Sequence, residues 1–470
     1  MAANVNNNDV ILDSNAANAP HCAHGPTLLF VRYISGGKSS KRFYACSACR
    51  DRKDCNFYQL EDEKISEAKL KRREEFNKSQ QPPFTHENYQ QRLQRFCESP
   101  VESRCYCIDC QLLLLPTEIK QHQQNSHKLK KNITDKMLSN PTQLFPPYQS
   151  NKVYAQYHFS RRTLDLLKTT FEHQNITHTL CVGVPSLHEA IQNEKNCKIK
   201  SLLLDLDHRY MQVYSDEKFC RYNMFNNYFF NNTTAFENYQ RFIAEEDATK
   251  KLAVVFDPPF GCMIEVLAHS YNNLLKQWQS LSKKTSESVL PAIIILPYFM
   301  EKRVQDSFTG FFMLDYKISY TNHRQFTEEH SDKKSTVRIF TNIERHLIHL
   351  PENEGYWYCD ICCCYSSPEN KHCNKCGSCT SKDGKTYVHC DKCARCVKPN
   401  RVHCDICQIC QTNGHQCNVK SMKSGCHICG DLTHKRKVCP QSQSNILNKR
   451  KQKISNEATN CKKKKRKLKP

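Results

Sequence analysis

The sequence has no long hydrophobic run. The longest, around residues 293–296, is far below the roughly 20 residues of a membrane-spanning helix. The opening MAANVNNNDV lacks the basic segment and following apolar segment of a secretion signal. Glycine is scarce, with 12 residues in 470, whereas a collagen-like repeat needs glycine at every third position. We therefore expect a protein that is neither secreted, membrane-spanning nor collagen-like, and that has no membrane partner.

Acidic residues are in the minority. The chain has 47 Asp and Glu against 69 Lys and Arg, which gives a net charge of +22 and favours a polyanionic partner, nucleic acid before an acidic membrane. Cysteine, by contrast, is abundant, with 30 residues. Disulfide scaffolds this rich in cysteine are normally short and secreted, so these thiols are expected to be metal ligands of an intracellular protein.

The cysteines divide the chain into blocks. Eight lie in residues 1–150 and seventeen in 359–439, but only four, without metal-type spacing, lie in 155–350. The middle is therefore expected to fold around a hydrophobic core, and the flanking blocks around metal ions. From residue 448 on, eleven Lys and Arg against one Glu predict a disordered basic tail that supplies nearly half of the net charge.

The middle segment alternates short β-branched runs with helical stretches. Strands are predicted at 179–184, 201–205, 251–256 and 292–296, helices at 186–196 and 262–284, and two further strands at 310–319 and 335–342. This order predicts an α/β fold with a parallel sheet covered by helices. Ligands of such sheets bind beyond the carboxyl ends of the strands.

Two residues at these strand ends could hold a ligand. Gly183 follows the first run and lets a ligand approach the backbone, although a plain strand-to-helix turn is the alternative, because the three-glycine dinucleotide fingerprint is absent. Asp205 ends the second run, where an acidic residue commonly receives ribose hydroxyls. A solvated loop carboxylate is the alternative for Asp205 and for Asp207 close behind it.

The third run is followed by Asp257-Pro258-Pro259-Phe260. This motif resembles that of the amino-group methyltransferases that use S-adenosylmethionine. The resemblance implies that Asp257 and the Pro258 carbonyl accept the two N–H bonds of an exocyclic amine, that the prolines restrict the backbone, and that Phe260 stacks on an extruded base. A tight turn without a catalytic role is the alternative, and the position directly after a buried strand weighs against it.

The same resemblance implies further cofactor contacts. The segment Gln156-Tyr157-His158-Phe159 resembles the part of these enzymes that covers the methionine end of the cofactor, and Asn223 with Met224 could contact the adenine ring. Core packing is an equal alternative for the aromatic-rich 219–230 region. The predicted cofactor-binding residues are Gln156, Tyr157, His158, Phe159, Gly183, Pro185, Asp205, Asn223, Met224 and Asp257.

Two metal sites are predicted before the central segment. The first block resembles the GRF zinc finger, which implies the ligands Cys22, His24, Cys46 and Cys55, with Cys49 as a competing thiol. Fingers of that family bind single-stranded nucleic acid, and a purely structural zinc is the alternative. The second block has close to C2H2 spacing and predicts Cys107, Cys110, His122 and His127, although Cys105 could replace a ligand. We expect this finger to brace the linker or to add phosphate contacts.

The block after the central segment repeats the unit His-Cys-x2-Cys-x2-Cys three times and resembles the cysteine-rich part of DHHC-type palmitoyltransferases. Acyl transfer is not expected, because the DHHC tetrad and membrane helices are absent. Two or three interleaved structural zinc sites are predicted from Cys359, Cys362, His372, Cys373, Cys376, Cys379, His389, Cys390, Cys393, Cys396, His403, Cys404, Cys407, Cys410, His415 and Cys417.

The last block, Cys426-x2-Cys429-x4-His434-x4-Cys439, matches the CCHC zinc knuckle at every ligand. Knuckles read single-stranded RNA. The predicted domains are a GRF-type finger at 20–62, a helical charged linker at 63–100, a C2H2-type finger at 101–132, a methyltransferase domain at 150–350, a DHHC-like zinc domain at 356–420, a knuckle at 424–441 and a disordered tail at 442–470.

In this combination the chain resembles the eukaryotic zinc-knuckle rRNA adenine-N6 methyltransferases. The resemblance implies a Rossmann-like S-adenosylmethionine-dependent core, structural Zn2+, methylation of one adenosine flipped out of structured large-subunit rRNA, pre-ribosomal or RNA-processing partner proteins, a monomer, and a nuclear or nucleolar location that can include the cytoplasm. Methylation of another RNA or of DNA, and a non-catalytic RNA-binding adaptor, are the alternatives. Chelation is expected to unfold the flanking blocks and to leave the central sheet able to bind cofactor.

Overall fold

The structure is a computed structural model that describes residues 8–12, 18–33, 40–48, 54–147, 157–230, 233–244, 249–323, 335–417 and 439–440. Within these ranges, no helix combines the length and the apolar character needed to cross a bilayer. The predicted contacts of Gln156, the thiol of Cys49 and the predicted ligands Cys426, Cys429 and His434 lie outside the described residues.

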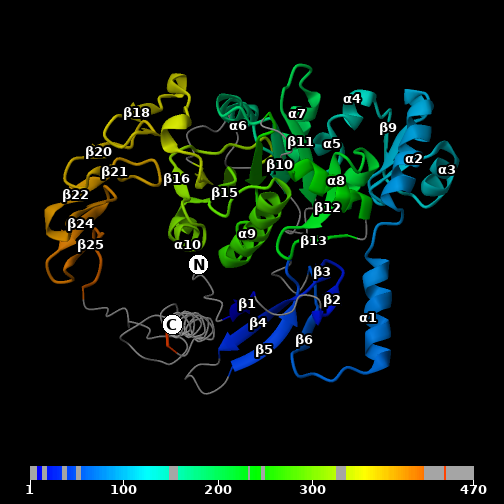
Figure 1. The fold of residues 1–470 in the computed structure, drawn as a ribbon, viewed down its shortest axis with the longest axis horizontal. Coiled ribbons are helices and arrows are strands. Elements are labelled where there is room, and N and C mark those ends of the chain that lie inside the picture. Colours follow the sequence, from blue (N-terminus) through cyan, green and yellow to red (C-terminus); the bar gives the residue numbers. More distant parts are fainter. Residues whose placement is uncertain are drawn as a thin grey trace, which may run out of the picture.

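An eight-stranded sheet forms the centre of the molecule, in the order β13-β12-β11-β10-β14-β15-β17-β16 (Figure 1). The five strands from β12 to β15 in this order are parallel, and β13, β17 and β16 are antiparallel to their neighbours. The α/β class predicted from the sequence is therefore confirmed. The strands are β10 His178–Val182, β11 Lys200–Asp205, β12 Phe219–Asn223, β13 Tyr228–Phe229, β14 Leu252–Phe256, β15 Ala292–Pro297, β16 Phe312–Leu314 and β17 Val337–Thr341.

Helices cover both faces of this sheet because its strands are apolar on both sides. Cys181 and its sheet neighbours Leu203 and Val255 pack into one buried cluster together with α6 Arg161–His173 and α7 Pro185–Asn193. The alternate residues, such as Leu180, pack on the other face. That face is covered by α8 Thr233–Ile243, α9 Ile264–Leu281 and α10 Glu301–Ser307.

Several central elements are absent from the sequence prediction. Strand β12 has the sequence FCRYN, in which an arginine and an asparagine interrupt the apolar run that marks the other strands. Helices α6 and α8 are amphipathic, with buried residues on one side only, and no β-branched run points to them. Their burial comes from the sheet, which a local pattern does not contain.

The residues before the sheet form two small domains and a helical connection. The first contains a four-stranded sheet and the hairpin β2 His21–Cys22 with β3 Gly25–Pro26; the strands of its sheet are β1 Asn8–Ile11, β4 Leu28–Tyr33, β5 Ser40–Ala45 and β6 Tyr58–Leu60. Helices α1 Glu67–Ser79 and α2 His86–Glu98 follow, capped by Ser66 and Thr85. The second domain contains β7 Cys105–Cys107, β8 Leu112–Leu114, α3 Pro116–Gln124 and β9 Leu129–Lys131. Two short helices, α4 Asp135–Leu138 and α5 Pro141–Leu144, lead to the central domain.

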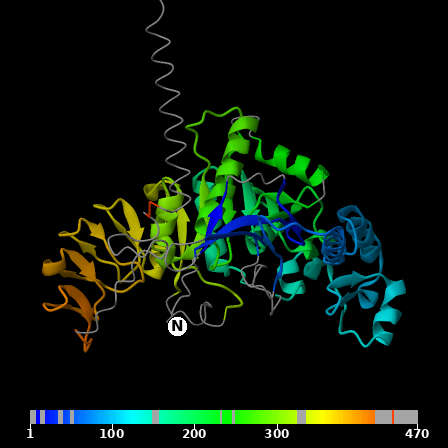
Figure 2. The ribbon, with the colours of Figure 1, turned by 90° about the horizontal axis from the view of Figure 1, so that it is seen from below.

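The residues after the sheet form a row of four two-stranded hairpins, which we call the arm. It curves away from the central domain on the side opposite α2 and α3, so that the molecule is crescent-shaped when seen from below (Figures 1 and 2). The hairpins are β18 Trp357–Cys359 with β19 Cys364–Ser366, β20 His372–Cys373 with β21 Ser378–Cys379, β22 Val388–Cys390 with β23 Arg395–Val397, and β24 Arg401–Cys404 with β25 Ile409–Thr412.

Candidate functional site

The carboxyl ends of three neighbouring parallel strands bring the central candidate residues together. Val182 lies beside Leu204 on one side and beside Phe256 on the other, so Gly183, Asp205 and Asp257 meet at one edge of the sheet. The Gly183 amide donates to the Leu204 carbonyl at 2.9 Å, and the Asp257 amide donates to the Val182 carbonyl at 3.2 Å. This edge lies where the strand order reverses, which is the usual ligand position in open α/β sheets.

Gly183 allows close packing at this edge. Its φ is +68°, and a Cβ at this position would lie 2.7 Å from Cε of Met224 and 3.2 Å from the carbonyl oxygen of Asp257. The residue also forms the turn into α7, whose first residue is Pro185. Glycine is therefore required both for the turn and for the close approach of Met224 and the Asp257 backbone.

Asp205 presents a carboxylate oxygen that no described residue satisfies. The side chain is buried, and its Oδ1 accepts a hydrogen bond from the Asp207 amide at 2.9 Å, while Oδ2 has no hydrogen-bond partner. Burial, together with the nearby Asp207 carboxylate, raises the pKa of Asp205 to about 7. Asp205 is thus not a solvated carboxylate, and the buried acceptor fits the ribose hydroxyls of S-adenosylmethionine.

Asp207 is occupied in a different way. Its two carboxylate oxygens accept hydrogen bonds from the buried guanidinium of Arg209, with Nη2 to Oδ2 at 2.6 Å. Arg209 also donates to the side-chain oxygen of Gln111 in the second small domain and to the Pro146 carbonyl. The pair therefore fastens the second small domain to the sheet, in line with the expected bracing role.

The Asp257-Pro258-Pro259-Phe260 segment forms a closed turn next to Asp205. The Cys262 amide donates to the Pro259 carbonyl at 2.8 Å, Pro258 is buried, and Phe260 packs against the α6–α7 side of the core. Burial raises the pKa of Asp257 well above its usual range, and the neighbouring carboxylate of Asp205 adds to the shift. A positively charged ligand between these carboxylates would relieve this repulsion, and the sulfonium of S-adenosylmethionine carries such a charge.

The segment at 157–159 lies beside an aromatic group that the sequence prediction did not include. Phe159 forms a β-bridge with Tyr320, and the Tyr157 ring lies 5.7 Å from the Tyr320 ring and 4.5 Å from the His323 ring. The buried Tyr320 hydroxyl has no hydrogen-bond partner among the described residues, and burial together with the Asp257 carboxylate raises the pKa of Tyr320. The bridge to Phe159 brings Tyr320 here.

His158 belongs to the same segment. Its backbone amide donates a hydrogen bond to the side-chain oxygen of Asn322 at 2.9 Å, which fixes the backbone at this residue. Burial lowers the pKa of His158 to about 4, so the imidazole is neutral at physiological pH. Its Nδ1 is buried and has no partner among the described residues.

Asn223 and Met224 face in different directions. The Asn223 amide nitrogen donates to the His24 carbonyl and to Oγ of Ser47, both at 2.8 Å, so its side chain faces the first small domain. Met224 is directed toward Gly183. Contact between either residue and the adenine ring stays a prediction.

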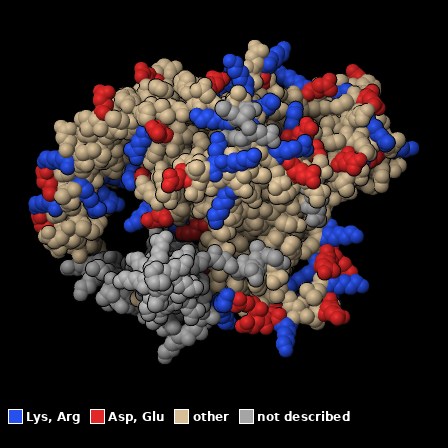
Figure 3. All heavy atoms as spheres, in the orientation of Figure 1, with Lys and Arg blue, Asp and Glu red and all other residues tan. Residues whose placement is uncertain are grey.

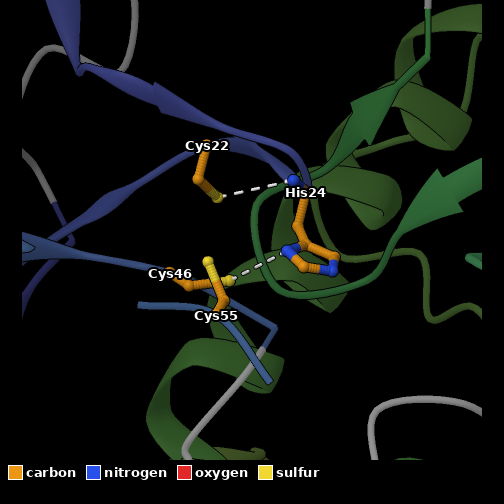
Figure 4. Close-up of side chains that lie close together, drawn as sticks. All are labelled: Cys22, His24, Cys46 and Cys55. Atoms are coloured by element: carbon orange, nitrogen blue, oxygen red, sulfur yellow. Dashed lines mark hydrogen bonds between the residues drawn. The ribbon is translucent and has the colours of Figure 1, made fainter. Parts of the chain in front are cut away.

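The first small domain brings Cys22, His24, Cys46 and Cys55 together (Figure 4). Sγ of Cys46 lies 3.6 Å from Nδ1 of His24, and the His24 amide donates to Sγ of Cys22 at 3.4 Å. A tetrahedral zinc site with Zn–S bonds of 2.3 Å has ligand–ligand separations of about 3.8 Å. The donor set therefore fits a closed zinc site.

The second small domain brings Cys107, Cys110, His122 and His127 together in the same way. Sγ of Cys107 and Sγ of Cys110 lie 3.6 and 3.3 Å from Nδ1 of His127. Cys105 is buried on β7 outside this set, so the alternative in which it replaces a ligand does not apply to the described arrangement.

The arm holds four donor sets among its described residues, so the expectation of two or three is wrong. Each set combines two cysteines of one hairpin with a histidine and a cysteine that follow it in the chain; the sets are Cys359, Cys362, His372 and Cys379; Cys373, Cys376, His389 and Cys396; Cys390, Cys393, His403 and Cys410; and Cys404, Cys407, His415 and Cys417. Each metal would therefore join two consecutive repeat units.

The two middle histidines of the arm each lie near a carboxylate. Nε2 of His389 lies 3.6 Å from a carboxylate oxygen of Asp391, and Nε2 of His403 lies 3.6 Å from Asp405, both beyond hydrogen-bond distance. Neighbouring cysteines of the arm have Sγ–Sγ separations of 3.5–3.9 Å, far beyond the S–S bond of about 2.05 Å, so these thiols are free to bind metal. Of the predicted knuckle ligands only Cys439, which is buried, is described.

Known proteins share these features. The family described as "Probable N6-adenine methyltransferase" matches residues 150–345, and the GRF zinc finger family matches residues 20–64. The human "rRNA N(6)-adenosine-methyltransferase ZCCHC4" is 44% identical over 94% of this chain and 87% of its own length. The proteins of the same name from Xenopus tropicalis and Mus musculus are each 44% identical over 92% of this chain, and over 88% and 85% of their own lengths.

This identity extends over the central sheet and both flanking regions, which matches the combination of motifs found along the chain. The chain belongs to the family of ZCCHC4 rRNA N(6)-adenosine methyltransferases, which are S-adenosylmethionine-dependent enzymes with zinc-binding domains.

Proposed function

We propose that this chain transfers a methyl group from S-adenosylmethionine to N6 of one adenosine in large-subunit ribosomal RNA. The observation that carries the proposal is the edge of the sheet where the unsatisfied oxygen of Asp205, the Gly183 turn and the Asp257 turn meet. The 44% identity over nearly the whole chain to methyltransferases named for rRNA supports the choice of substrate.

When bound, S-adenosylmethionine supplies an electrophilic methyl group. Asp205 would hold its ribose, the backbone at Gly183 would lie along the adjoining chain, and Tyr157 and Phe159 would cover the methionine end. The Asp257 carboxylate and the Pro258 carbonyl accept the two N–H bonds of the adenine amine, which returns the nitrogen lone pair from the ring to the attacking position. Much of the rate would come from this alignment.

The environment of Asp257 suits a proton acceptor. After methyl transfer the nitrogen carries one proton too many, and Asp257 already contacts one of its N–H groups. Since burial and Asp205 raise the pKa of Asp257, its carboxylate binds a proton more readily than an exposed one would. Phe260, packed on the α6–α7 core, would stack on the flipped adenine and exclude water.

Basic side chains of the arm, the central domain and the first small domain offer a surface for the RNA backbone. Figure 3 shows Lys and Arg on the side of the arm that faces the central domain and across the middle of that domain. Lys385, Arg395 and Arg401 are exposed residues of the arm. In the first small domain the exposed guanidinium of Arg32 lies 5.2 Å from the centroid of the buried Phe43 ring and adds a further cation for the RNA backbone.

We further propose that the protein acts as a monomer, in the nucleus and nucleolus and also in the cytoplasm, with pre-ribosomal or RNA-processing proteins as partners. The basic tail from residue 448 supports a nuclear address and nonspecific RNA affinity. Imaging of the tagged full chain, with and without residues 448–470, tests the location; a tail deletion that leaves the distribution unchanged would contradict the role of the tail.

The decisive experiment uses the purified full chain, radiolabelled S-adenosylmethionine and total RNA from cells that lack the enzyme. We expect label in large-subunit rRNA with the wild type and none above background with Asp257→Ala. Asp165→Ala is the matched control, because the Asp165 side chain lies on the exposed side of α6 and forms ion pairs with Arg161 and Lys168. Label confined to messenger RNA, small nuclear RNA or DNA would replace the substrate, and RNA binding without any transfer would favour an adaptor.

A further inference from the structure

The zinc loop of the first small domain is fastened to the turn that follows β12. The Asn223 amide nitrogen donates to the carbonyl of the ligand His24 and to the hydroxyl of Ser47, the residue after the ligand Cys46. Asn226, three residues on, donates to the Pro26 carbonyl at 2.7 Å. The acceptors therefore lie on or next to residues whose positions the metal would set, and Figure 4 shows the domain's ligands lying against the central domain.

Shape complementarity supports the same contact. Gly25 has φ +90°, and a Cβ there would lie 2.5 Å from Cδ1 of Tyr228, so the β13 ring packs directly against the zinc-loop backbone. His21 lies edge-on to the same ring at 5.6 Å. Cys22 and Cys46 are each 5% exposed and belong to the same buried cluster as residues of β10, β11 and β14. The finger thus shares a core with the sheet.

The other end of this contact reaches the cofactor edge. Asn223 also uses its Oδ1, which accepts a hydrogen bond from the Phe225 amide at 3.1 Å and so fixes the turn that carries Met224. Met224 extends toward Gly183, and a Cβ added at residue 183 would lie only 2.7 Å from the Met224 Cε. A connected series of contacts therefore runs from the zinc ligands through Asn223 and Met224 to Gly183.

We propose that Asn223 is a positioning residue for the cofactor, and that occupancy of the first zinc site sets the affinity for S-adenosylmethionine. When the metal holds His24 and Cys46, the carbonyl of His24 and the hydroxyl of Ser47 hold Asn223, and Met224 stays packed against Gly183. Without the metal, these two acceptors lose their fixed positions and Met224 is free to move at the cofactor edge. The proposal therefore predicts that chelation weakens cofactor binding, in contrast to the expectation from the sequence.

The test measures the dissociation constant of S-adenosylmethionine by calorimetry on the full chain, without RNA. Asn223→Ala removes two hydrogen bonds to the finger and should weaken cofactor binding about tenfold. Cys46→Ser, with loss of one zinc confirmed by metal analysis, should weaken binding by a similar factor. The double variant should bind S-adenosylmethionine no more weakly than the single variant with the larger loss, because both changes break the same series of contacts.

Controls separate this role from general destabilisation. Asn193→Ala removes an amide that donates to the Ser139 carbonyl at the end of α4, and Cys393→Ser empties a donor set in the arm; both should leave the dissociation constant unchanged. Asn226→Ala is a milder change and should give a smaller loss of affinity for S-adenosylmethionine. It tests the same contact if Asn223→Ala does not fold. Wild-type affinity in folded Asn223→Ala or Asn226→Ala, or additive losses in the double variant, would overturn the proposal.

The proposal rests on the proposed function only in placing the cofactor beside Gly183 and Asp205. Its failure can be told apart from failure of that function. If the wild type binds no S-adenosylmethionine, the proposed function fails; if it binds and the variants at Asn223 and Asn226 bind equally well, only the positioning role fails.

Discussion

The first finger and the arm both use zinc donor sets, but they are attached to the sheet differently. In the finger, the ligands Cys22 and Cys46 are buried within the core of the central domain. In the arm, the ligands are mostly half-buried and link one hairpin to the next. The arm is joined to the sheet through Asp315, whose Oδ2 accepts hydrogen bonds from the amide and hydroxyl of Ser367 and from Asn370.

This difference predicts that substitutions in the two regions have different effects on cofactor binding. A substitution in the finger should change the cofactor affinity, because the finger and the sheet share a core. A substitution in the arm should change only the structure of the arm, because each donor set there contacts its neighbours, as in repeat proteins. The changes that follow probe this contrast.

The largest effect is expected from Cys393→Ser in the middle of the arm. Structural zinc contributes about 10–16 kcal/mol in finger peptides, far more than side-chain contacts do. Since the third set spans two repeat units, its loss should expose the backbone of residues 388–412 to rapid hydrogen exchange. Cofactor affinity should not change. Cys363→Ser, at an exposed non-ligand position, is the control, and a protected arm in Cys393→Ser would argue against interlocked sites.

The next largest effect is expected where the arm meets the sheet. Asp315→Ala removes the acceptor of three hydrogen bonds and leaves the fully buried Arg338, whose Nε lies 3.7 Å from Oδ1 of Asp315, without its countercharge. Loss of one partner of a buried ion pair costs about 3–5 kcal/mol, measurable by urea denaturation. Glu369→Gln, which removes a partly exposed contact to Lys317, should cost less than about 1 kcal/mol. Equal losses would mean that Asp315 is not the anchor.

A glycine pair compares the two regions directly. Gly25→Ala in the finger combines the left-handed φ of +90° with a clash against Tyr228, so it should lower the free energy of unfolding by about 3 kcal/mol. Gly377→Ala in the arm has φ +62° and open space around the Cβ position, so only the backbone cost of about 1 kcal/mol applies. Thermal denaturation of both variants checks the difference, which should vanish if Tyr228 does not pack on Gly25.

The smallest effect is expected from pH. The pKa of Asp205 is raised from 3.8 to about 7, so its carboxylate protonates as the pH falls below 7. Because the ionised form is the better acceptor for ribose hydroxyls, affinity for S-adenosylmethionine should fall about tenfold between pH 8 and pH 6. S-adenosylhomocysteine, which keeps the ribose and lacks the sulfonium charge, should show the ribose part of this dependence alone. The affinity of Asp205→Asn for S-adenosylmethionine should not depend on pH in this range, whereas that of the wild type should fall as the pH falls.

The same group affects stability with the opposite sign. An acid whose pKa is raised on folding binds more protons in the folded state, so the cofactor-free protein should lose stability as the pH rises from about 4 to about 7. Asp205→Asn should remove this loss. Urea denaturation at pH 5 and pH 8 measures it, and a wild type that is more stable at pH 8 through this residue would contradict the assigned shift.

The strands of the central sheet could be predicted because their apolar runs are long and β-branched, as in the AIIIL segment of β15. The meeting of Gly183, Asp205 and Asp257 follows from parallel strands, whose carboxyl ends share an edge. Tyr320 could not be predicted, because it reaches the site through a bridge to Phe159, more than a hundred residues away in the chain.

The zinc donor sets show the same limit. Local spacing identifies candidate ligands but not which of them share a metal, because His389 follows the Cys373 pair in the chain and directly precedes Cys390. The contact of Asn223 with the first small domain could not be predicted for a similar reason, since its partners His24 and Ser47 lie far away in the sequence.

The crossed pairing in the arm has one more consequence. Every repeat unit offers a histidine and a final cysteine to the set before it, and two cysteines to the set after it. Deleting residues 389–402 would therefore place His403 and Cys410 opposite Cys373 and Cys376 and close a complete set, with no ligand left over. The arm can gain or lose length in whole metal sites, which makes it a spacer of adjustable reach, whereas the finger, set into the core, admits no such change.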